Sequence, residues 1–126
     1  MKKLLDTLQS TVKIRFQDCD PFNHLNNAAY LNYFVNARED QILEQYGIDI
    51  YEMASTIGVS WVVGSNQIAY INPAFLMEEV IIESQLLSFD ETSLFIEFIL
   101  TLLIKSFKFK QLHCLGRPVV APYSSP

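Results

Sequence analysis

The amino-acid sequence predicts an α+β fold in which an antiparallel sheet packs against one long helix. Two observations support this prediction: an apolar stretch with helical caps lies in the first half of the chain, and segments rich in β-branched and aromatic residues follow it. The chain has 126 residues, of which 50% are hydrophobic, enough for one core with little room for a second. We therefore expect residues 1–126 to form a single domain.

The first predicted elements are a strand and the long helix. Residues Thr11 to Phe16 alternate in polarity and include β-branched side chains, as expected of a half-buried strand. Asn26 or Asn27 can cap the N-terminus of the helix. We expect the helix to end near Tyr46, because Gly47 is a typical residue at a helix C-terminus.

The first part of this helix is almost entirely apolar. Between Ala28 and Ala37 the polar residues are Asn32 and Asn36, which lie one turn apart and form a narrow polar stripe. A helix with so little polar surface is usually covered by other structure. We therefore expect most of the helix surface to be enclosed.

The rest of the chain predicts strands separated by turns. The expected strands cover residues 59–72, 79–88 and 93–112, with turns at 73–74 and 89–92 and a last turn at 116–118 before a loose tail. Residues 48–58 form a connection that can hold one helical turn. The stretch 93–112 is long for one strand, and we expect that a hairpin tip is missing between Thr101 and Leu103.

The charge and the N-terminal sequence exclude several kinds of partner. The net charge is −5 and the isoelectric point is about 4.9, which disfavours nucleic-acid binding because phosphate recognition needs a basic face. The apolar run near the N-terminus is only Leu4-Leu5, too short for a signal sequence or a membrane span. We expect a cytoplasmic protein with no membrane partner.

Neither the cysteines nor the histidines predict a metal site. Cys19 and Cys114 are far apart and lack the spacing of a zinc or disulfide framework, although a bridge between them is conceivable. His24 and His113 are the only histidines, so a site with several histidine ligands is excluded. We expect no metal.

Asp20 is the candidate with most chemical interest. It lies just before the helix, and Pro21 disfavours helical geometry at Asp20, so its carboxylate should stay outside the helix and face its end. A helix N-terminus offers unpaired N–H groups and partial positive charge, which can stabilise negative charge on a substrate oxygen. Alternatively, Asp20 only bonds backbone N–H groups near the helix start. Asp18 is better interpreted as a loop-bonding or solvated carboxylate.

The motif D-x-D-P-x-x-H-x-N-N-x-x-Y from Asp18 to Tyr30 is followed by the buried helix with Ala37-Arg38, and Ile71-Asn72-Pro73 follows a strand. This arrangement resembles hot dog fold acyl-CoA thioesterases of the 4-hydroxybenzoyl-CoA thioesterase type. The resemblance implies an antiparallel sheet wrapped around one long central helix and assembly as a homodimer or homotetramer. It also implies an acyl-CoA substrate and no cofactor, since coenzyme A is part of the substrate. Asn23 occupies a position where many members carry glycine, and asparagine also tolerates left-handed geometry.

The resemblance also implies the roles of individual residues. Asp20 matches the catalytic carboxylate, and a backbone N–H at Asn27 or a neighbour would polarise the thioester carbonyl. Residues near 64–67 of a second subunit would line the same site. The candidates are therefore Asp20, His24 and Asn27 for catalysis, and Asn26, Tyr30, Gly64, Ser65 and Gln67 for substrate binding.

Several of these candidates also have a structural interpretation. His24 either positions substrate or water, or bonds backbone carbonyls to hold its loop. Asn26 and Asn27 are first helix caps, and Tyr30 is more often a core residue with a satisfied hydroxyl. Serine nucleophily is disfavoured because no serine lies in a G-x-S-x-G context.

Three functions are compatible with the sequence. The leading hypothesis is an acyl-CoA thioesterase that uses Asp20 as nucleophile or general base. The alternative is a non-catalytic module that binds acyl-CoA or an acyl carrier protein, and a hot dog dehydratase that uses His24 is a third. Retention of Asp20 together with the Asn26-Asn27 pair favours the enzyme.

Overall fold

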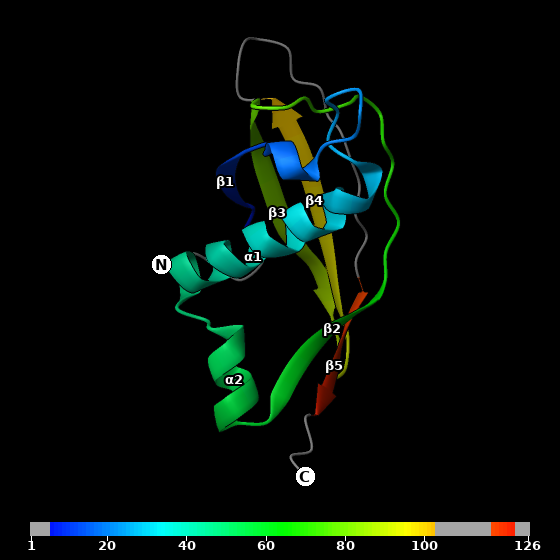
Figure 1. The fold of residues 1–126 in the computed structure, drawn as a ribbon. Helices are drawn as coiled ribbons and strands as arrows, with labels where there is room; N and C mark the ends of the chain where they lie inside the picture. Colours follow the sequence, from blue (N-terminus) through cyan, green and yellow to red (C-terminus); the bar gives the residue numbers. More distant parts are fainter. Residues whose placement is uncertain (1–5, 103–116, 123–126) are drawn as a thin grey trace.

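The computed structural model describes residues 6–102 and 117–122. A long helix lies across one face of a three-stranded antiparallel sheet, and a separate strand pair lies beyond one end of that sheet (Figure 1). The helices are α1 (Tyr30–Tyr46) and α2 (Ile50–Thr56), preceded by 3₁₀ turns at Phe16–Asp18 and Asn27–Ala29. The strands are β1 (Leu8–Lys13), β2 (Val59–Ser65), β3 (Glu79–Phe89), β4 (Leu94–Leu102) and β5 (Arg117–Pro122).

The larger sheet has the strand order β1-β3-β4. β3 is central because it pairs antiparallel with both neighbours, with Val80 opposite Val12 on one side and Leu102 on the other. Alternate residues of β3 and β4 are buried, as a sheet with one covered face requires. The β3–β4 turn is closed by the Asp90 carboxylate, which accepts the backbone N–H groups of Thr92 and Ser93.

The caps of the long helix agree with the sequence prediction. The side chain of Asn26 accepts the N–H of Ala28 at the Asn27–Ala29 3₁₀ turn, which continues into α1. At the other end Gly47 adopts a left-handed conformation with φ 68°, and its N–H donates to the carbonyl of Leu43. The predicted helix and both of its ends are therefore confirmed.

The predicted enclosure agrees with the first part of the helix, where only Ala28, Asn32 and Asn36 of residues 28–37 are exposed, but not with the second half of α1. One stripe of α1 is buried against the sheet, formed by Tyr30, Phe34, Ala37 and Gln41. Phe34 is fully buried and stacks on Phe98 of β4, with ring centroids 5.2 Å apart. The Asn32 and Asn36 stripe is exposed as expected, and in the second half of α1 Asp40 and residues 43–45 are exposed as well.

Gln41 anchors the second half of α1 to two strands. Its Nε2 donates to the hydroxyl of Ser10 in β1 at 2.8 Å and to the carbonyl of Ile82 in β3 at 3.0 Å. Its Oε1 accepts the hydroxyl of Ser84, which in turn accepts Nη1 of Arg38 at 3.0 Å. Burial lowers the pKa of the Arg38 guanidinium. These polar groups are satisfied inside the apolar core, so they fix the helix against the sheet.

Several predicted strand boundaries are shifted. The first strand begins at Leu8 and ends at Lys13, because residues 16–18 turn into a 3₁₀ segment instead of continuing to Phe16. The second ends at Ser65, and residues 66–73 run outside the sheets past the N-terminal end of α1 (Figure 1). The connection after α1 contains the short helix α2, whose N-cap Asp49 accepts two backbone N–H groups.

The predicted last turn and loose tail are also wrong in part. Arg117–Pro122 forms β5, which pairs antiparallel with β2, from Val59 opposite Pro122 to Val63 opposite Pro118. Proline suggested a turn, but a strand can hold proline where no ladder bond needs its missing N–H. The expected missing hairpin tip falls next to residues 103–116, which lie outside the described residues together with Cys114 and His113.

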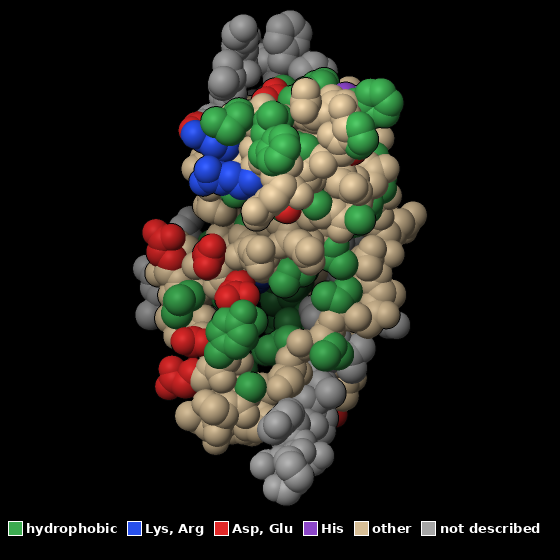
Figure 2. Space-filling view, viewed as in Figure 1, with side chains coloured by type: hydrophobic (Ala, Val, Ile, Leu, Met, Phe, Trp, Pro, Cys, Tyr) green, Lys and Arg blue, Asp and Glu red, His purple; other side chains and the backbone are tan. Residues whose placement is uncertain are grey.

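The charged side chains are unevenly distributed on the described surface. On the face in Figure 2, acidic side chains gather along α1 and α2, whereas basic side chains gather beside β1. This view shows no continuous basic face among the described residues, in agreement with the net charge of −5. Among the described residues, no helix has the length and apolar character needed to cross a bilayer.

Candidate active site

Asp20 closes a tight loop that precedes the helix. Its Oδ1 accepts the backbone N–H groups of Phe22 at 2.8 Å and His24 at 3.0 Å, and its own N–H donates to the carbonyl of His24. Asn23 completes the loop with a left-handed φ of 62°, the geometry that asparagine tolerates. The carboxylate is therefore held in one orientation by backbone groups of its own loop, and not by N–H groups of the helix.

The second carboxylate oxygen of Asp20, Oδ2, does not take part in the hydrogen bonds that hold the loop. Oδ2 lies 3.9 Å from Nδ1 of His24, and the Asp20 side chain is 29% exposed, so substrate or water can reach it. The imidazole of His24 meets the ring of Phe75 edge-on, with centroids 4.8 Å apart. His24 is thus held beside Asp20 by packing, and its backbone N–H and carbonyl both bond Asp20.

A cavity of about 460 Å³ opens beside this loop at the start of the helix. It is lined by two stretches of chain that are far apart in sequence. The lining residues are Asp20, His24, Leu25, Asn26, Asn27, Tyr30, Tyr70, Ile71, Asn72 and Pro73. The structure therefore brings together all of the predicted site residues that precede residue 31.

The helix start offers one free backbone donor. The Asn26 carbonyl accepts the N–H of Ala29 at 2.8 Å, and the N–H of Ala28 is bonded to the Asn26 side chain. Within the part of the chain that the structure describes, the N–H of Asn27 has no acceptor. Because the C=O and N–H of a trans peptide point in opposite directions, this N–H points away from the Asn26 carbonyl and out of the helical turn. It is available to a ligand oxygen in the cavity.

Tyr30 is a buried wall of the cavity, whereas the Gly64–Gln67 region lies outside it. Tyr30 is 1% exposed, and its hydroxyl accepts the N–H of Ala74 at 3.3 Å, so it forms a wall of the cavity as part of the core. Gly64, Ser65 and Gln67 are exposed at and after the end of β2 and do not line this cavity. Their contribution from a second subunit remains a prediction.

The sequence did not single out Tyr70 and Asn72 as site residues. The segment that carries them is bound to the Asp20 loop by backbone hydrogen bonds, from Leu25 to the carbonyl of Ala74 and from Leu76 to that of Asn23. Its local signals were Pro73, which ends the strand pattern, and the Ile71-Asn72-Pro73 motif that forms part of the family resemblance. Their place in the site depends on contacts between distant parts of the chain, which periodicity does not reveal.

Cys19, between the two aspartates, is a poor nucleophile. Burial raises the pKa of its thiol, and the negative charges of Asp20 and Asp18 raise it further. The thiolate is the reactive form of cysteine, and it is disfavoured here. The loop therefore leaves Asp20 as its reactive group.

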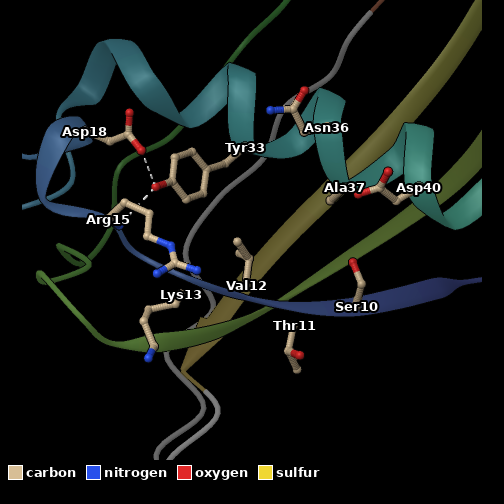
Figure 3. A pocket seen from close by; sticks show the side chains of 10 residues that line it. All are labelled: Ser10, Thr11, Val12, Lys13, Arg15, Asp18, Tyr33, Asn36, Ala37 and Asp40. Carbon is tan, nitrogen blue, oxygen red and sulfur yellow. Dashed lines mark hydrogen bonds between the residues drawn. The ribbon is translucent and has the colours of Figure 1, made fainter.

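Asp18 belongs to a different cavity, of about 290 Å³, between β1 and α1 (Figure 3). Tyr33 reaches across from α1, donates its hydroxyl to Oδ2 of Asp18 and accepts the backbone N–H of Arg15 at 3.1 Å. Burial and the hydrogen bond to Asp18 raise the pKa of Tyr33 to about 12. Asp18 thus bonds the loop to the helix, as its structural interpretation predicted.

We expect Tyr33→Phe to lower the free energy of unfolding by about 1 kcal/mol near neutral pH, the typical net value of a hydrogen bond. The folded pKa of about 12 lies above the ordinary value near 10, so the hydroxyl's contribution is complete below about pH 10 and is lost as the pH rises through 12. Urea unfolding at about pH 8 and about pH 11 should show a smaller difference between wild type and Tyr33→Phe at the higher pH. An equal difference at both values would contradict this role.

The described residues contain no group of three or more histidine, cysteine, aspartate or glutamate side chains that could hold a metal ion. What the cavity does contain is a carboxylate oxygen and a free N–H at a helix start. The carboxylate can attack a carbonyl, directly or through water, and the N–H can stabilise the resulting oxyanion.

Comparison with known proteins defines the class. A profile of the thioesterase-like superfamily matches residues 14–114, and the chain belongs to this superfamily. The crystal structure of a probable thioesterase from Bartonella henselae superposes with a TM-score of 0.82, covering 93% of each chain at 16% identity. This similarity confirms the predicted α+β hot dog fold.

Individual relatives are thioesterases or probable thioesterases. The chain is 32% identical to the long-chain acyl-CoA thioesterase FadM of Escherichia coli K12 over 79 residues, which span 63% of this chain and 58% of FadM. The crystal structure of the probable thioesterase YbaW from Escherichia coli has a TM-score of 0.76 at 26% identity, covering 91% of this chain and 83% of YbaW. A thioesterase from Thermus thermophilus, solved with coenzyme A and Zn, is 25% identical with a TM-score of 0.72 and coverage of 94% and 85%.

Proposed function

We propose that this protein hydrolyses an acyl-CoA thioester to a free carboxylic acid and coenzyme A, with Asp20 as nucleophile or general base. The observation that carries this proposal is the pairing, in one cavity, of the Asp20 carboxylate with the unbonded N–H of Asn27. Membership of the thioesterase-like superfamily and the similarity to FadM support the same reaction.

The substrate carbonyl would lie at the start of the helix. Its oxygen accepts the Asn27 N–H, and the partial positive charge of the helix end stabilises the oxyanion that develops there. Asn26 has a supporting role, because its side chain and carbonyl already bond Ala28 and Ala29. This arrangement polarises the carbonyl without a metal ion in the proposed step.

Asp20 can act in either of two ways. As a general base, it takes a proton from water, hydroxide adds to the carbonyl carbon, the C–S bond breaks, and the coenzyme A thiolate takes up the proton. As a nucleophile, Oδ2 adds to the carbonyl carbon and expels the thiolate, leaving an anhydride that water hydrolyses. We propose that His24, whose Nδ1 lies 3.9 Å from Oδ2, orients the carboxylate or a water molecule in both cases.

We also propose that the active form is a cytoplasmic homodimer or homotetramer. Gly64, Ser65 and Gln67 are exposed in the single chain, so a second subunit could bring them to the cavity. The partner would then complete the acyl-binding part of the site.

The alternative is a module that binds acyl-CoA or an acyl carrier protein without hydrolysis. One observation favours it: Oδ1 of Asp20 is fully used in bonding the loop backbone, which is what a purely structural aspartate does. The free Oδ2 oxygen and the free Asn27 donor favour the enzyme.

The test is a panel of acyl-CoA thioesters with short, medium and long aliphatic acyl groups and with aromatic ones. We expect thiol release, followed with a thiol-reactive dye, and an equal amount of free acid by mass spectrometry for at least one substrate. Calorimetric binding without thiol release across the panel would support the binding module and contradict the enzyme. Dehydration of a hydroxyacyl-CoA without thiol release would instead indicate a dehydratase.

A further inference from the structure

The segment that follows β2 meets the helix start through one side chain. The hydroxyl of Tyr70 donates to the carbonyl of Asn27 at 2.9 Å. Tyr70 also lines the cavity that contains Asp20. Tyr70 therefore links the cavity wall formed by residues 70–73 to Asn27, the residue whose N–H has no acceptor among the described residues.

The ring of Tyr70 is held by the core. It packs edge-on against Tyr30, with centroids 5.1 Å apart and planes at 75°. Tyr30 is fully buried, so the Tyr70 ring packs against a side chain that is fixed in the core. The Tyr70 side chain is nevertheless partly exposed, and its hydroxyl could bond water if Asn27 were not its partner. Its position depends on the ring, whereas its effect on Asn27 depends on the hydroxyl.

Both peptide groups that flank the Cα of Asn27 are constrained. The peptide before it is held by the hydrogen bond from Ala29 to the Asn26 carbonyl. The peptide after it lies in the 3₁₀ turn Asn27–Ala29 and is held further by the Asn26 side chain at the Ala28 N–H and by Tyr70 at the Asn27 carbonyl. Removal of the Tyr70 hydroxyl takes away the side-chain bond at the Asn27 carbonyl and loosens the backbone at Asn27.

We propose that Tyr70 is a positioning residue for the thioesterase reaction: its hydroxyl fixes the Asn27 backbone so that the Asn27 N–H is aimed at the thioester oxygen before substrate arrives. This inference rests on the proposed function. Oxyanion donors act through such preorganisation, because the reaction then need not reorient them. Tyr70 does not contact the reacting atoms in this scheme and acts only through Asn27.

The test compares Tyr70→Phe with Tyr51→Phe. Tyr70→Phe keeps the ring and removes only the hydroxyl. Tyr51 lies on α2, is not among the cavity-lining residues, is 68% exposed, and donates its hydroxyl to Glu39 at 3.2 Å, so it provides a matched loss of one tyrosine hydroxyl. We expect Tyr70→Phe to lower kcat about tenfold, less than deletion of an oxyanion donor, with KM changed less than about twofold. Tyr51→Phe should leave both values unchanged.

A second measurement needs no turnover. The amide and carbonyl NMR signals of Asn27 should shift in Tyr70→Phe and stay in place in Tyr51→Phe, at an unchanged urea midpoint for both variants. Unchanged kcat or unchanged Asn27 signals in Tyr70→Phe would overturn the positioning role while leaving a functioning thioesterase. A joint loss of kcat and stability would also overturn it, because a purely structural role predicts that pattern. If the wild type releases no thiol from any acyl-CoA, the proposed function itself fails.

Discussion

Replacement of Asp20 by asparagine is expected to lower kcat for acyl-CoA hydrolysis by about 10²–10⁴-fold, the usual contribution of a general acid–base group. Asparagine keeps an oxygen that can accept the N–H groups of Phe22 and His24, so the loop should retain its shape. It removes the negative charge and the basic oxygen that faces the cavity. Steady-state thiol release measures the rate, and calorimetry should show that acyl-CoA still binds.

Asp18→Asn is the matched control for this experiment. Asp18 lies only two positions from Asp20, but it lines the cavity between β1 and α1 and bonds Tyr33. The substitution again exchanges a carboxylate for an amide that can accept a hydrogen bond, and kcat should stay within about twofold of wild type. Equal activity of Asp20→Asn and wild type would remove Asp20 from the mechanism.

The largest effect on stability is expected for Phe34→Ala. Phe34 is 0% exposed and stacks on Phe98 between α1 and β4, so truncation opens a cavity where the helix meets the sheet. Loss of a buried phenylalanine costs about 3–5 kcal/mol of unfolding free energy. Urea unfolding followed by circular dichroism measures the change.

Leu43→Ala serves as the comparison on the same helix. Leu43 is 49% exposed, and its truncation should cost less than about 1 kcal/mol. If the two substitutions had similar effects, Phe34 would not belong to the central core that the structure shows. If Phe34→Ala does not fold, Phe34→Leu gives a smaller loss in the same direction.

The fold was predictable where local rules agree with tertiary structure. Asn26 and Gly47 bound the helix in the sequence and in the structure, because capping depends on neighbouring residues only. Runs of β-branched and aromatic residues bounded by turn residues predicted β3 and β4 for the same reason. The strand β5 was missed because its prolines favour a turn locally, and only pairing with β2 makes them part of a strand.

The candidate site was predictable in part. Asp20, His24, Asn26, Asn27 and Tyr30 follow one another along the chain, so a single motif was sufficient to group them. The other wall of the cavity comes from residues 70–73, and its most informative contact, from Tyr70 to Asn27, links residues that no local pattern connects. The sequence also did not reveal that Asp20 bonds its own loop. Its position just before the helix is compatible both with a catalytic carboxylate and with one that bonds backbone N–H groups.

The hydrogen bonds of Gln41 have a consequence for the opposite end of α1. Gln41 has acceptors and donors on β1 and β3 at one position only, so its hydrogen bonds add to side-chain packing in fixing where α1 lies along its axis on the sheet. Tyr30 lies roughly 16 Å away along the same rigid helix, at 1.5 Å per residue. An amide that is not among the cavity-lining residues therefore contributes to the position of the helix start, together with the backbone bonds of the Asp20 loop. Variation at Gln41 can change the rate of the reaction while every residue of the cavity stays the same.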